Sequence, residues 1–386
     1  MAKDVIYLDH AATSWPKPPE VIRAVVEAME QAGANAGRGS HSLAVDSGRL
    51  LVRARMELAQ LFGIRNAQDL AFCYNTTMAL NMAIQGTLKP GDHVIATMAE
   101  HNSVRRPLEY LRRTRGVEVD FAEVDADGYV NLSHLGRLFR PNTKLVVCTH
   151  SSNLLGSIQP VGEIGDLAKS RGARFLVDAA QSAGSLDIDV SLMNIDLLAF
   201  PGHKGLLGPQ GTGGLYIAPD LDLEPILTGG TGSQSENREQ PDVRPDRYES
   251  GTQNVPGIAG LLAGVRRVRE WKPGCIHRRE WEQVQMLMEG LQELPGIRLL
   301  GPRAGEERSG LIAFTVKGLD SARVAHRLDR EFGIAVRAGM HCAPLAHEAM
   351  GTLASGAVRA SVGVGTTEDE VRSLLEAMRH ILGAGV

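Results

Sequence analysis

The run Asp196-Leu-Leu-Ala-Phe-Pro-Gly-His-Lys-Gly205 places a lysine directly after an apolar strand. Ammonium groups are rarely buried in proteins unless they are paired or used chemically. A lysine that condenses with a carbonyl cofactor needs this kind of position, with a fixed backbone, partial desolvation and glycines that admit the cofactor. A surface lysine at a strand end is the plainer interpretation that this run alone leaves open.

A second apolar run, Phe175-Leu-Val-Asp178-Ala-Ala-Gln181, ends in a carboxylate upstream of that lysine. A strand-end aspartate followed by a strand-end lysine is the spacing of a pyridoxal phosphate (PLP) site. The pair Asp178 and Lys204 therefore favours a PLP enzyme over a surface lysine.

Short apolar runs alternate with segments of helical periodicity through the first two thirds of the chain. Because buried parallel strands read as continuous apolar runs, this pattern predicts an α/β fold with a mostly parallel sheet flanked by helices. Ligands in such sheets sit beyond the carboxyl ends of the strands, where His150, Asp178 and Lys204 lie. The predicted strands are residues 93–97, 145–149, 175–177 and 197–200.

The pattern changes after Trp271 to a smaller α/β unit with predicted strands at 311–316, 334–336 and 357–361 and a helix at 321–332. The last helix begins at a capping box, Thr367-Glu-Asp-Glu370. The change after Trp271 predicts a large domain followed by a small domain. The large domain is assigned residues 15–269, and the small domain residues 1–14 and 270–386.

A polar segment, residues 228–247, interrupts the large domain. It has almost no large apolar side chains and is too long for a plain connector. The segment is predicted to be either a disordered loop or a functional lid.

Composition excludes several classes of protein. The 386 residues, 43% of them hydrophobic, are enough for two domains. The net charge of −4 gives no basic footprint for nucleic acid, and the arginines between 105 and 115 are typical of a solvated helix face. No stretch is long enough for a membrane span and no secretory signal is visible. The four cysteines form no metal-like cluster, which predicts no metal site and a cytoplasmic setting.

Several polar residues lie where a cofactor could be bound, although each has a plainer interpretation. Thr76 and Thr77 precede a helical stretch, where hydroxyl and backbone N–H groups either bind phosphate or cap the helix. His101 could be a surface or core histidine, and Asn153 and Gln181 could shape turns. None of these residues is informative alone, but their order along the chain makes the combination informative.

That order resembles the class V aminotransferase family of fold-type I PLP enzymes, and within it the cysteine desulfurases. The resemblance covers essentially the whole chain. Its most specific part is the Gly-x-His-Cys-Ala loop, which is similar to that of group II, SUF-type desulfurases; kynureninases, serine–pyruvate-type aminotransferases and related lyases share the earlier motifs. The matching motifs are Tyr7-Leu-Asp9-His-Ala-Ala-Thr13, Thr76-Thr77, Glu100-His101, Ser152-Asn153, Val177-Asp178-Ala-Ala-Gln181, His203-Lys204, Glu249-Ser-Gly251-Thr252, Arg337-Ala-Gly339-Met-His341-Cys342-Ala-Pro344 and Val358-Arg359.

The resemblance implies an aspartate-aminotransferase-like fold, whose large domain binds PLP and whose small domain carries the cysteine loop. Lys204 would hold PLP covalently and move protons at the substrate α-carbon. Asp178 would pair with the pyridinium nitrogen, so that the ring acts as an electron sink. Gln181 would hydrogen-bond the ring hydroxyl, and Asn153 would support that edge and the substrate. His101 would stack on the ring and assist proton transfer.

The resemblance also implies where phosphate and substrate bind. Thr77 and His203 would bind the phosphate, with Thr76 near it and Thr252 reaching in from the second subunit of a homodimer. Arg359 would clamp the substrate carboxylate with its planar fork, for which a guanidinium suits better than an ammonium.

Cys342 separates desulfuration from the other reactions of the family. Cys73 and Cys148 lie inside apolar runs, as buried small hydrophobes do, and Cys275 is interpreted as a bystander. Cys342 lies instead in a stiff loop, and its neighbour His341 could raise the thiolate fraction.

The implied reaction converts L-cysteine to L-alanine. The Cys342 thiolate would attack the substrate sulfur, and the resulting persulfide would pass sulfur to an acceptor protein that the sequence does not identify. The alternatives are a selenocysteine lyase, another PLP-dependent C–S lyase, an aminotransferase, or a non-catalytic scaffold of a sulfur-transfer complex. A scaffold would not need Lys204, Asp178, His101 and Arg359 together.

Two features depart from the group II pattern. Pro201 stands where a serine commonly precedes Gly-His-Lys, and proline has no hydroxyl or N–H to give the phosphate. The polar segment 228–247 also lacks the aromatic residues expected there, so the sequence leaves the sulfur acceptor open.

Overall fold

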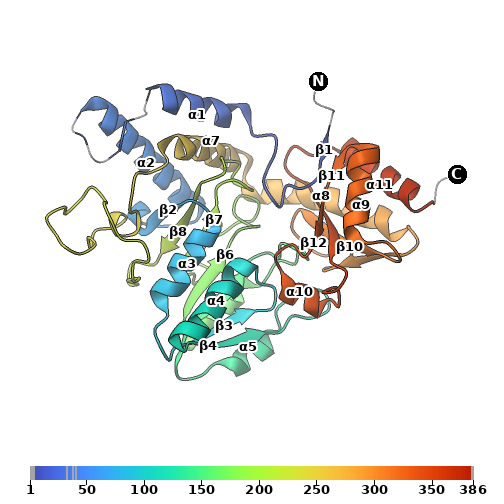
Figure 1. Cartoon of the computed structure of the whole chain (residues 1–386), viewed down its shortest axis with the longest axis horizontal. Helices are drawn as coiled ribbons and strands as arrows, with labels where there is room; N and C mark the ends of the chain where they lie inside the picture. The colour runs from blue at the N-terminus through green and yellow to red at the C-terminus, as the bar shows by residue number, and fades with distance from the viewer. Residues whose placement is uncertain (1–4, 32–33, 37–38, 40, 384–386) are drawn as a thin grey trace.

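The computed structural model describes residues 5–31, 34–36, 39 and 41–383. Its larger sheet has seven strands in the order β2-β8-β7-β6-β5-β3-β4 (Figure 1). All neighbouring pairs are parallel except those of β8, which runs antiparallel to β2 and β7. The strands are β2 (Leu70–Cys73), β3 (His93–Thr97), β4 (Glu118–Ala122), β5 (Thr143–Thr149), β6 (Arg174–Asp178), β7 (Leu197–Pro201) and β8 (Gly213–Ile217).

Helices cover both faces of this sheet, which confirms the predicted α/β fold with a mostly parallel sheet. Strand β5 is apolar throughout because both of its faces are buried. Val146 and Cys148 belong to the hydrophobic cluster on one face of the sheet, and Leu145 and Val147 belong to the cluster on the other face. The helices are α1 (Pro19–Gln31), α2 (Ser42–Leu61), α3 (Thr76–Thr87), α4 (Asn102–Arg115), α5 (Leu132–Leu138), α6 (Val161–Ser170) and α7 (Val255–Trp271).

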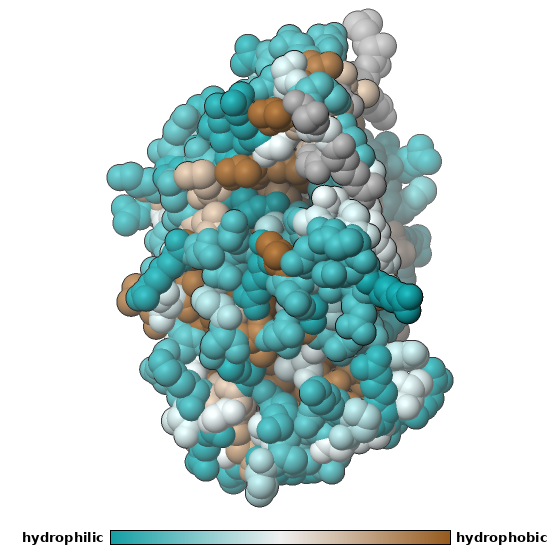
Figure 2. Space-filling model, turned by 90° about the vertical axis from the view of Figure 1, so that its left-hand side faces the viewer, coloured by the Kyte–Doolittle hydropathy of each residue, from teal (hydrophilic) through white to brown (hydrophobic). Residues whose placement is uncertain are grey.

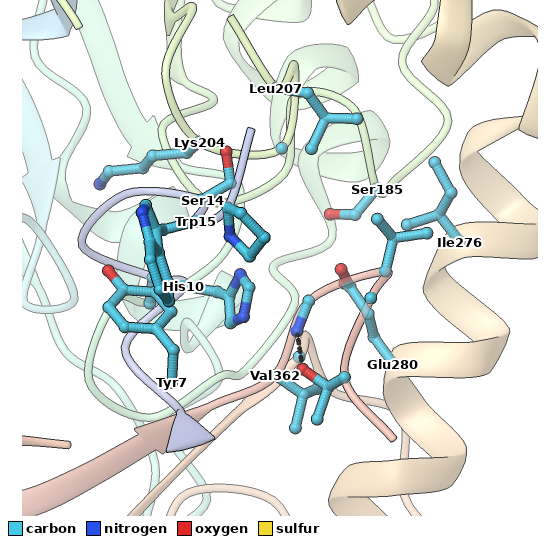
Figure 3. A pocket seen from close by; sticks show the side chains of 18 of the residues that line it. Tyr7, His10, Ser14, Trp15, Ser185, Lys204, Leu207, Ile276, Glu280 and Val362 are labelled. Atoms are coloured by element: carbon cyan, nitrogen blue, oxygen red, sulfur yellow. Dashed lines mark hydrogen bonds between the residues drawn. The ribbon is translucent and has the colours of Figure 1, made fainter. Parts of the chain in front are cut away.

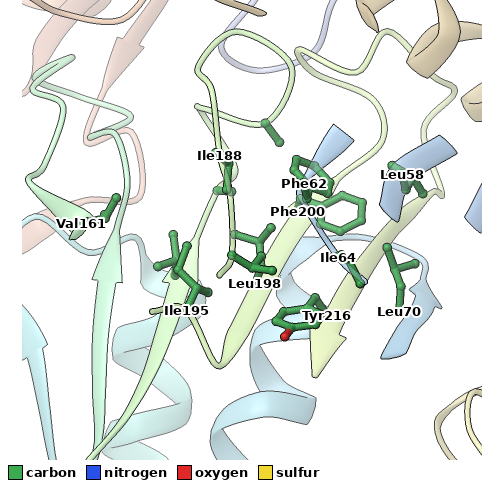
Figure 4. Close-up of a cluster of buried hydrophobic side chains, with 14 of the residues drawn as sticks. Leu58, Phe62, Ile64, Leu70, Val161, Ile188, Ile195, Leu198, Phe200 and Tyr216 are labelled. Carbon is green, nitrogen blue, oxygen red and sulfur yellow. The ribbon is translucent and has the colours of Figure 1, made fainter. Parts of the chain in front are cut away.

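One face of the sheet packs against α2, α5, α6 and α7. Phe62 at the end of α2 contacts Phe200 of β7 with ring centroids 4.9 Å apart (Figure 4). The other face packs against α3 and α4. The arginines of α4 point away from the sheet, and Arg112, Arg113 and Arg115 are exposed, as predicted for a solvated helix face.

A four-stranded antiparallel sheet, in the order β12-β13-β10-β9, forms the second lobe (Figure 1). The predicted capping box at Thr367 is present at the start of α11. The predicted strand 334–336 corresponds to the two-residue strand β11, which pairs with β1, and the chain then continues into β12 of the four-stranded sheet. The elements are β1 (Ile6–Tyr7), α8 (Pro273–Gln292), β9 (Ile297–Leu300), β10 (Leu311–Val316), α9 (Ser321–Phe332), β11 (Ile334–Ala335), β12 (Arg337–Gly339), α10 (Pro344–Ala349), β13 (Ala357–Ser361) and α11 (Glu368–Ile381).

The division into domains at residues 14/15 and 269/270 stays a prediction, and residues 1–4 and 384–386 of the small domain lie outside the described residues. Within the described part, no helix is both long and apolar enough to cross a membrane.

Buried polar contacts join the two lobes. The guanidinium of Arg308 is fully buried and donates to the carbonyl oxygens of Leu155 (2.7 Å), Pro302 (2.9 Å) and Leu311 (3.1 Å). Leu155 follows β5 of the large sheet, whereas the other two belong to the second lobe. Arg308 therefore fixes the chain after β5 against the four-stranded sheet.

The polar segment 228–247 is a loop up to the short 3-10 helix η2 (Asp246–Tyr248). Arg244 anchors it, because its guanidinium pairs with Asp69 at 3.0 Å and donates to the carbonyl oxygen of Ile217 at 3.1 Å. Its role as a lid stays a prediction.

Candidate active site

The carboxyl ends of β5, β6 and β7 lie side by side and bring the predicted residues together. Asp178 ends β6, Lys204 follows β7 and Asn153 follows β5. A pocket of about 110 Å³ lies at this edge of the sheet. Its lining contains most of the predicted cofactor residues: Thr76, Thr77, His101, Asn153, Asp178, Gln181, His203 and Lys204.

The floor of the pocket holds a buried carboxylate near an amine. Burial raises the pKa of Asp178 to about 6, opposed by the N–H of Ala180, which donates to Oδ1 at 2.9 Å, and by Lys204. Burial, and then the charge of Arg359, lower the pKa of Lys204 to about 8. A lysine with a lowered pKa is partly uncharged near neutral pH, which is the form that condenses with an aldehyde.

Hydroxyl groups and a helix start line one end of the pocket. Thr76 and Thr77 begin α3, whose N-cap Asn75 accepts from the N–H of Met78 at 2.9 Å. Such helix starts favour anions, because their first N–H groups have no partner within the helix. Thr77 Oγ1 also lies 2.7 Å from Oγ of Ser103, a pocket residue that the sequence reasoning missed.

His203 stands beside this end and is neutral. Its Nδ1 lies 3.1 Å from Oγ1 of Thr13, and burial followed by Lys204 and Lys17 lowers its pKa to about 4. A neutral imidazole can donate one hydrogen bond to a phosphate. Pro201 ends β7 and is buried, so it supplies no N–H here.

His101 is the N-cap of α4, and this fixes its ring. Its Nδ1 accepts from the backbone N–H of Ser103 at 3.0 Å. Burial, followed by the charges of Lys204 and Arg337, lowers its pKa to about 4. Since Nδ1 is an acceptor, the neutral ring carries its proton on Nε2.

Arg359 of β13 is almost fully buried between the two lobes. Its Nη2 donates to Asp9 Oδ1 at 2.9 Å and its Nη1 to the carbonyl oxygen of Asn153 at 2.8 Å. Its Nε has no hydrogen-bond partner among the described residues. The sequence reasoning assigned no role to Asp9, although it lies in one of the quoted motifs.

Cys342 lies in a short loop whose backbone is held at two points. His341 and Cys342 both have left-handed backbone angles, with φ of 49° and 56°. The side-chain amide of Asn153 donates to the carbonyl oxygen of His341 at 2.6 Å, and the N–H of Asn102 donates to that of Cys342 at 2.8 Å. Such angles cost non-glycine residues about 1–2 kcal/mol each, so the surrounding contacts must hold them.

The half-exposed thiol opens onto a cleft beside the pocket. This cleft, of about 650 Å³, is lined by Cys342 and also by Thr77, His101 and Ser103 of the pocket itself. Nη2 of Arg337 lies 3.9 Å from the sulfur. The cleft thus gives the thiol a route to the pocket, and Arg337 places a cation next to the sulfur.

His341 does not supply that positive charge. It is buried, and burial followed by the charges of Arg359 and Arg337 lowers its pKa to about 3. Its ring stacks on that of His347 with centroids 5.9 Å apart. The cation beside the thiol is therefore Arg337, five residues upstream in the same motif, and not the adjacent histidine that the sequence suggests.

The remaining predicted residue, Thr252, is exposed in the loop before α7 and does not line the pocket in this chain. Cys73 and Cys148 are buried, as predicted, and burial raises the pKa of both thiols. Cys275 is exposed.

Comparisons with known proteins identify the family of this chain. The family model Aminotransferase class-V matches residues 6–374, so the chain belongs to the class V aminotransferase family, as predicted. A probable cysteine desulfurase from Methanothermobacter thermautotrophicus is 36% identical, over 100% of this chain and 96% of its own length. A cysteine desulfurase from Haloferax volcanii is 31% identical, over 97% and 88%. The apo structure of a cysteine desulfurase from Thermococcus onnurineus NA1 superimposes with a TM-score of 0.93 at 36% identity, covering 99% of this chain and 96% of that one.

Proposed function

We propose that this protein is a PLP-dependent cysteine desulfurase, which converts L-cysteine to L-alanine and retains the sulfur as a persulfide on Cys342. The observation that carries the proposal is the shared lining of the two cavities: the Cys342 cleft and the Lys204 pocket have Thr77, His101 and Ser103 in common. A thiol placed in this way can meet a substrate held over Lys204. The names of the matched relatives and of the matched structure support the same reaction.

The pocket residues fit PLP, which the family implies. Lys204 supplies an amine of lowered pKa for the aldehyde, and Asp178 supplies a buried carboxylate for a protonated ring nitrogen. The start of α3, with Thr77 and the neutral His203, offers donors to a phosphate. When bound, PLP would supply an electron sink for the negative charge that forms at the substrate α-carbon.

Side chains of the protein carry out substrate binding, proton removal and attack on the substrate sulfur. The fork of Arg359 binds and orients the substrate carboxylate, and Lys204 takes the α-proton. The Cys342 sulfur, beside the Arg337 cation, attacks the substrate sulfur: an S–S bond forms, the substrate C–S bond breaks, and its electron pair stays with the carbon skeleton. That skeleton takes up one proton at the carbon that carried sulfur, regains one at the α-carbon from Lys204, and leaves as alanine, and the persulfide then passes its sulfur to an acceptor.

Product analysis tests this function. Purified protein supplied with L-cysteine and a thiol reductant should release alanine and sulfide in equal amounts. Alanine from selenocysteine alone would identify a selenocysteine lyase, and keto acid in place of alanine would identify an aminotransferase. No turnover of any of these substrates by PLP-loaded protein would favour the scaffold.

We also propose a homodimer in which each subunit supplies Thr252 to the other's pocket. Exposed apolar side chains on α1 and α2 support a partner surface, and Figure 2 shows apolar side chains among polar ones on the upper half of the side that α2 faces. On α1 they recur at helical spacing along one stripe. The exposed residues are Ile22, Val26, Met29, Leu43, Val45, Val52 and Met56.

A mixed dimer tests this sharing. Homodimers of Lys204→Ala should be inactive, and those of Thr252→Ala should bind PLP several-fold more weakly. When the two variants are co-expressed with different tags, the heterodimer should contain one site with both changes and one with neither. We expect close to half of the unsubstituted turnover per purified heterodimer, with the PLP affinity of the unsubstituted protein. If Thr252 acted within its own chain, the Lys204-bearing site of the heterodimer would bind PLP as weakly as Thr252→Ala homodimers do, and that result would contradict the sharing.

A further inference from the structure

A third cavity, of about 570 Å³, lies beside the active site (Figure 3). Its walls come from the segment before α1, the end of α7, the start of α8 and the loop between β13 and α11. It shares only Ala180, Gln181 and Lys204 with the PLP pocket. Its volume is in the range of cavities that bind small molecules.

Glu280 of α8 contributes its side chain to this cavity (Figure 3). The carboxyl lies over Gly310, where a Cβ would be 2.9 Å from Oε2. The lining around it includes the apolar side chains of Ile276, Leu311 and Val362. Glu280 has no hydrogen bond or ion pair with the described residues, and burial raises its pKa to about 8.

The other carboxylates of the cavity already have partners. Glu20 pairs with Arg267 at 2.5 Å, and Glu370 belongs to the capping box of α11. The ammonium of Lys17 donates to Oγ of Ser14 and to a backbone carbonyl. Glu280 is therefore the carboxylate in the described lining that has neither a hydrogen bond nor an ion pair, and an ionised carboxylate among apolar groups is unfavourable until a cation joins it.

Aromatic rings line the opposite wall of the same cavity. Trp15 is 51% exposed, and Tyr7 meets it edge to face with ring centroids 5.5 Å apart. The faces of such rings attract cations. The cavity thus combines an unpaired carboxyl, apolar side chains and aromatic surface.

We propose that this cavity binds a small organic cation with an apolar body, whose charge pairs with Glu280 and whose body lies against the apolar and aromatic walls. The proposal is independent of the desulfurase function, because Glu280 does not line the PLP pocket.

Calorimetric titration of the PLP-loaded protein with benzyltrimethylammonium tests the proposal. A quaternary ammonium suits the purpose because it cannot condense with the PLP aldehyde. We expect saturable binding that Glu280→Gln weakens at least tenfold, as expected for loss of a charge-assisted contact. The neutral benzyl alcohol should bind both proteins equally, and Glu282→Gln, on the exposed side of the same helix, should not change cation affinity.

Absence of cation binding to the unsubstituted protein, or equal affinity in Glu280→Gln, would overturn the proposal. Thermal unfolding checks that the variant is folded. If Glu280→Gln does not fold, the same titration is made with Trp15→Leu. Several-fold weaker cation binding by Trp15→Leu than by the unsubstituted protein would support the site, and unchanged binding would refute it.

Discussion

Replacement of Cys342 by alanine is expected to lower alanine release from L-cysteine by more than roughly a thousandfold, as loss of a nucleophile does in other enzymes. PLP binding and the spectral change on adding cysteine should persist, because Lys204, Asp178 and Arg359 are untouched. The measurement is single-turnover alanine formation together with the absorption spectrum. With selenocysteine some alanine is expected to survive, since selenium leaves more readily than sulfur.

The matched control is Cys275→Ala, since Cys275 is the exposed thiol away from the pocket. It should turn over cysteine like the unsubstituted protein. A limiting pulse of cysteine without reductant should add one sulfur atom to the Cys342 peptide, seen by mass spectrometry. Full turnover by Cys342→Ala, or the added sulfur on another cysteine, would contradict the mechanism.

Replacement of Arg359 by lysine is expected to raise the KM for cysteine by roughly ten- to over a hundredfold, because a charged hydrogen-bonded contact contributes on the order of 1.5–3 kcal/mol. Lysine keeps the charge but loses the planar fork that contacts Asp9 and the Asn153 carbonyl in the structure. Steady-state kinetics measure KM, and the PLP spectrum reports whether the cofactor site is intact.

Arg372→Lys, at an exposed position of α11, is the matched control and should leave KM unchanged. If Arg359→Lys binds cysteine as tightly as the unsubstituted protein, another group holds the substrate carboxylate.

The sequence predicted the parallel strands β3, β5, β6 and β7 and the residues at their carboxyl ends, because both follow from local pattern; the parallel edge strand β4 was not predicted. An apolar run reads as a buried strand, and the ends of neighbouring parallel strands meet, so Asp178 and Lys204 come together. Strand β8 was not among the predicted strands, and its apolar residues do not encode the antiparallel direction of its pairing.

The features of the site that the sequence did not predict depend on burial and on contacts between segments that are distant along the chain. Asp9 pairs with Arg359 across 350 positions of the chain, and no periodic pattern reports such a pair. The neutral state of His341 follows from its burial between two arginines, which the sequence does not display. The proximity of Arg337 to Cys342 needs the turn made by their loop.

The two hydrogen bonds that hold the Cys342 loop have a consequence for sulfur delivery. Asn153 and Asn102 hold the backbone on both sides of the thiol, so movement of the loop away from the active site would break both hydrogen bonds, at about 0.5–1.5 kcal/mol each. We therefore expect a sulfur acceptor to bring its own reactive group into the cleft beside α3 and α4, where the Cys342 thiol is partly exposed.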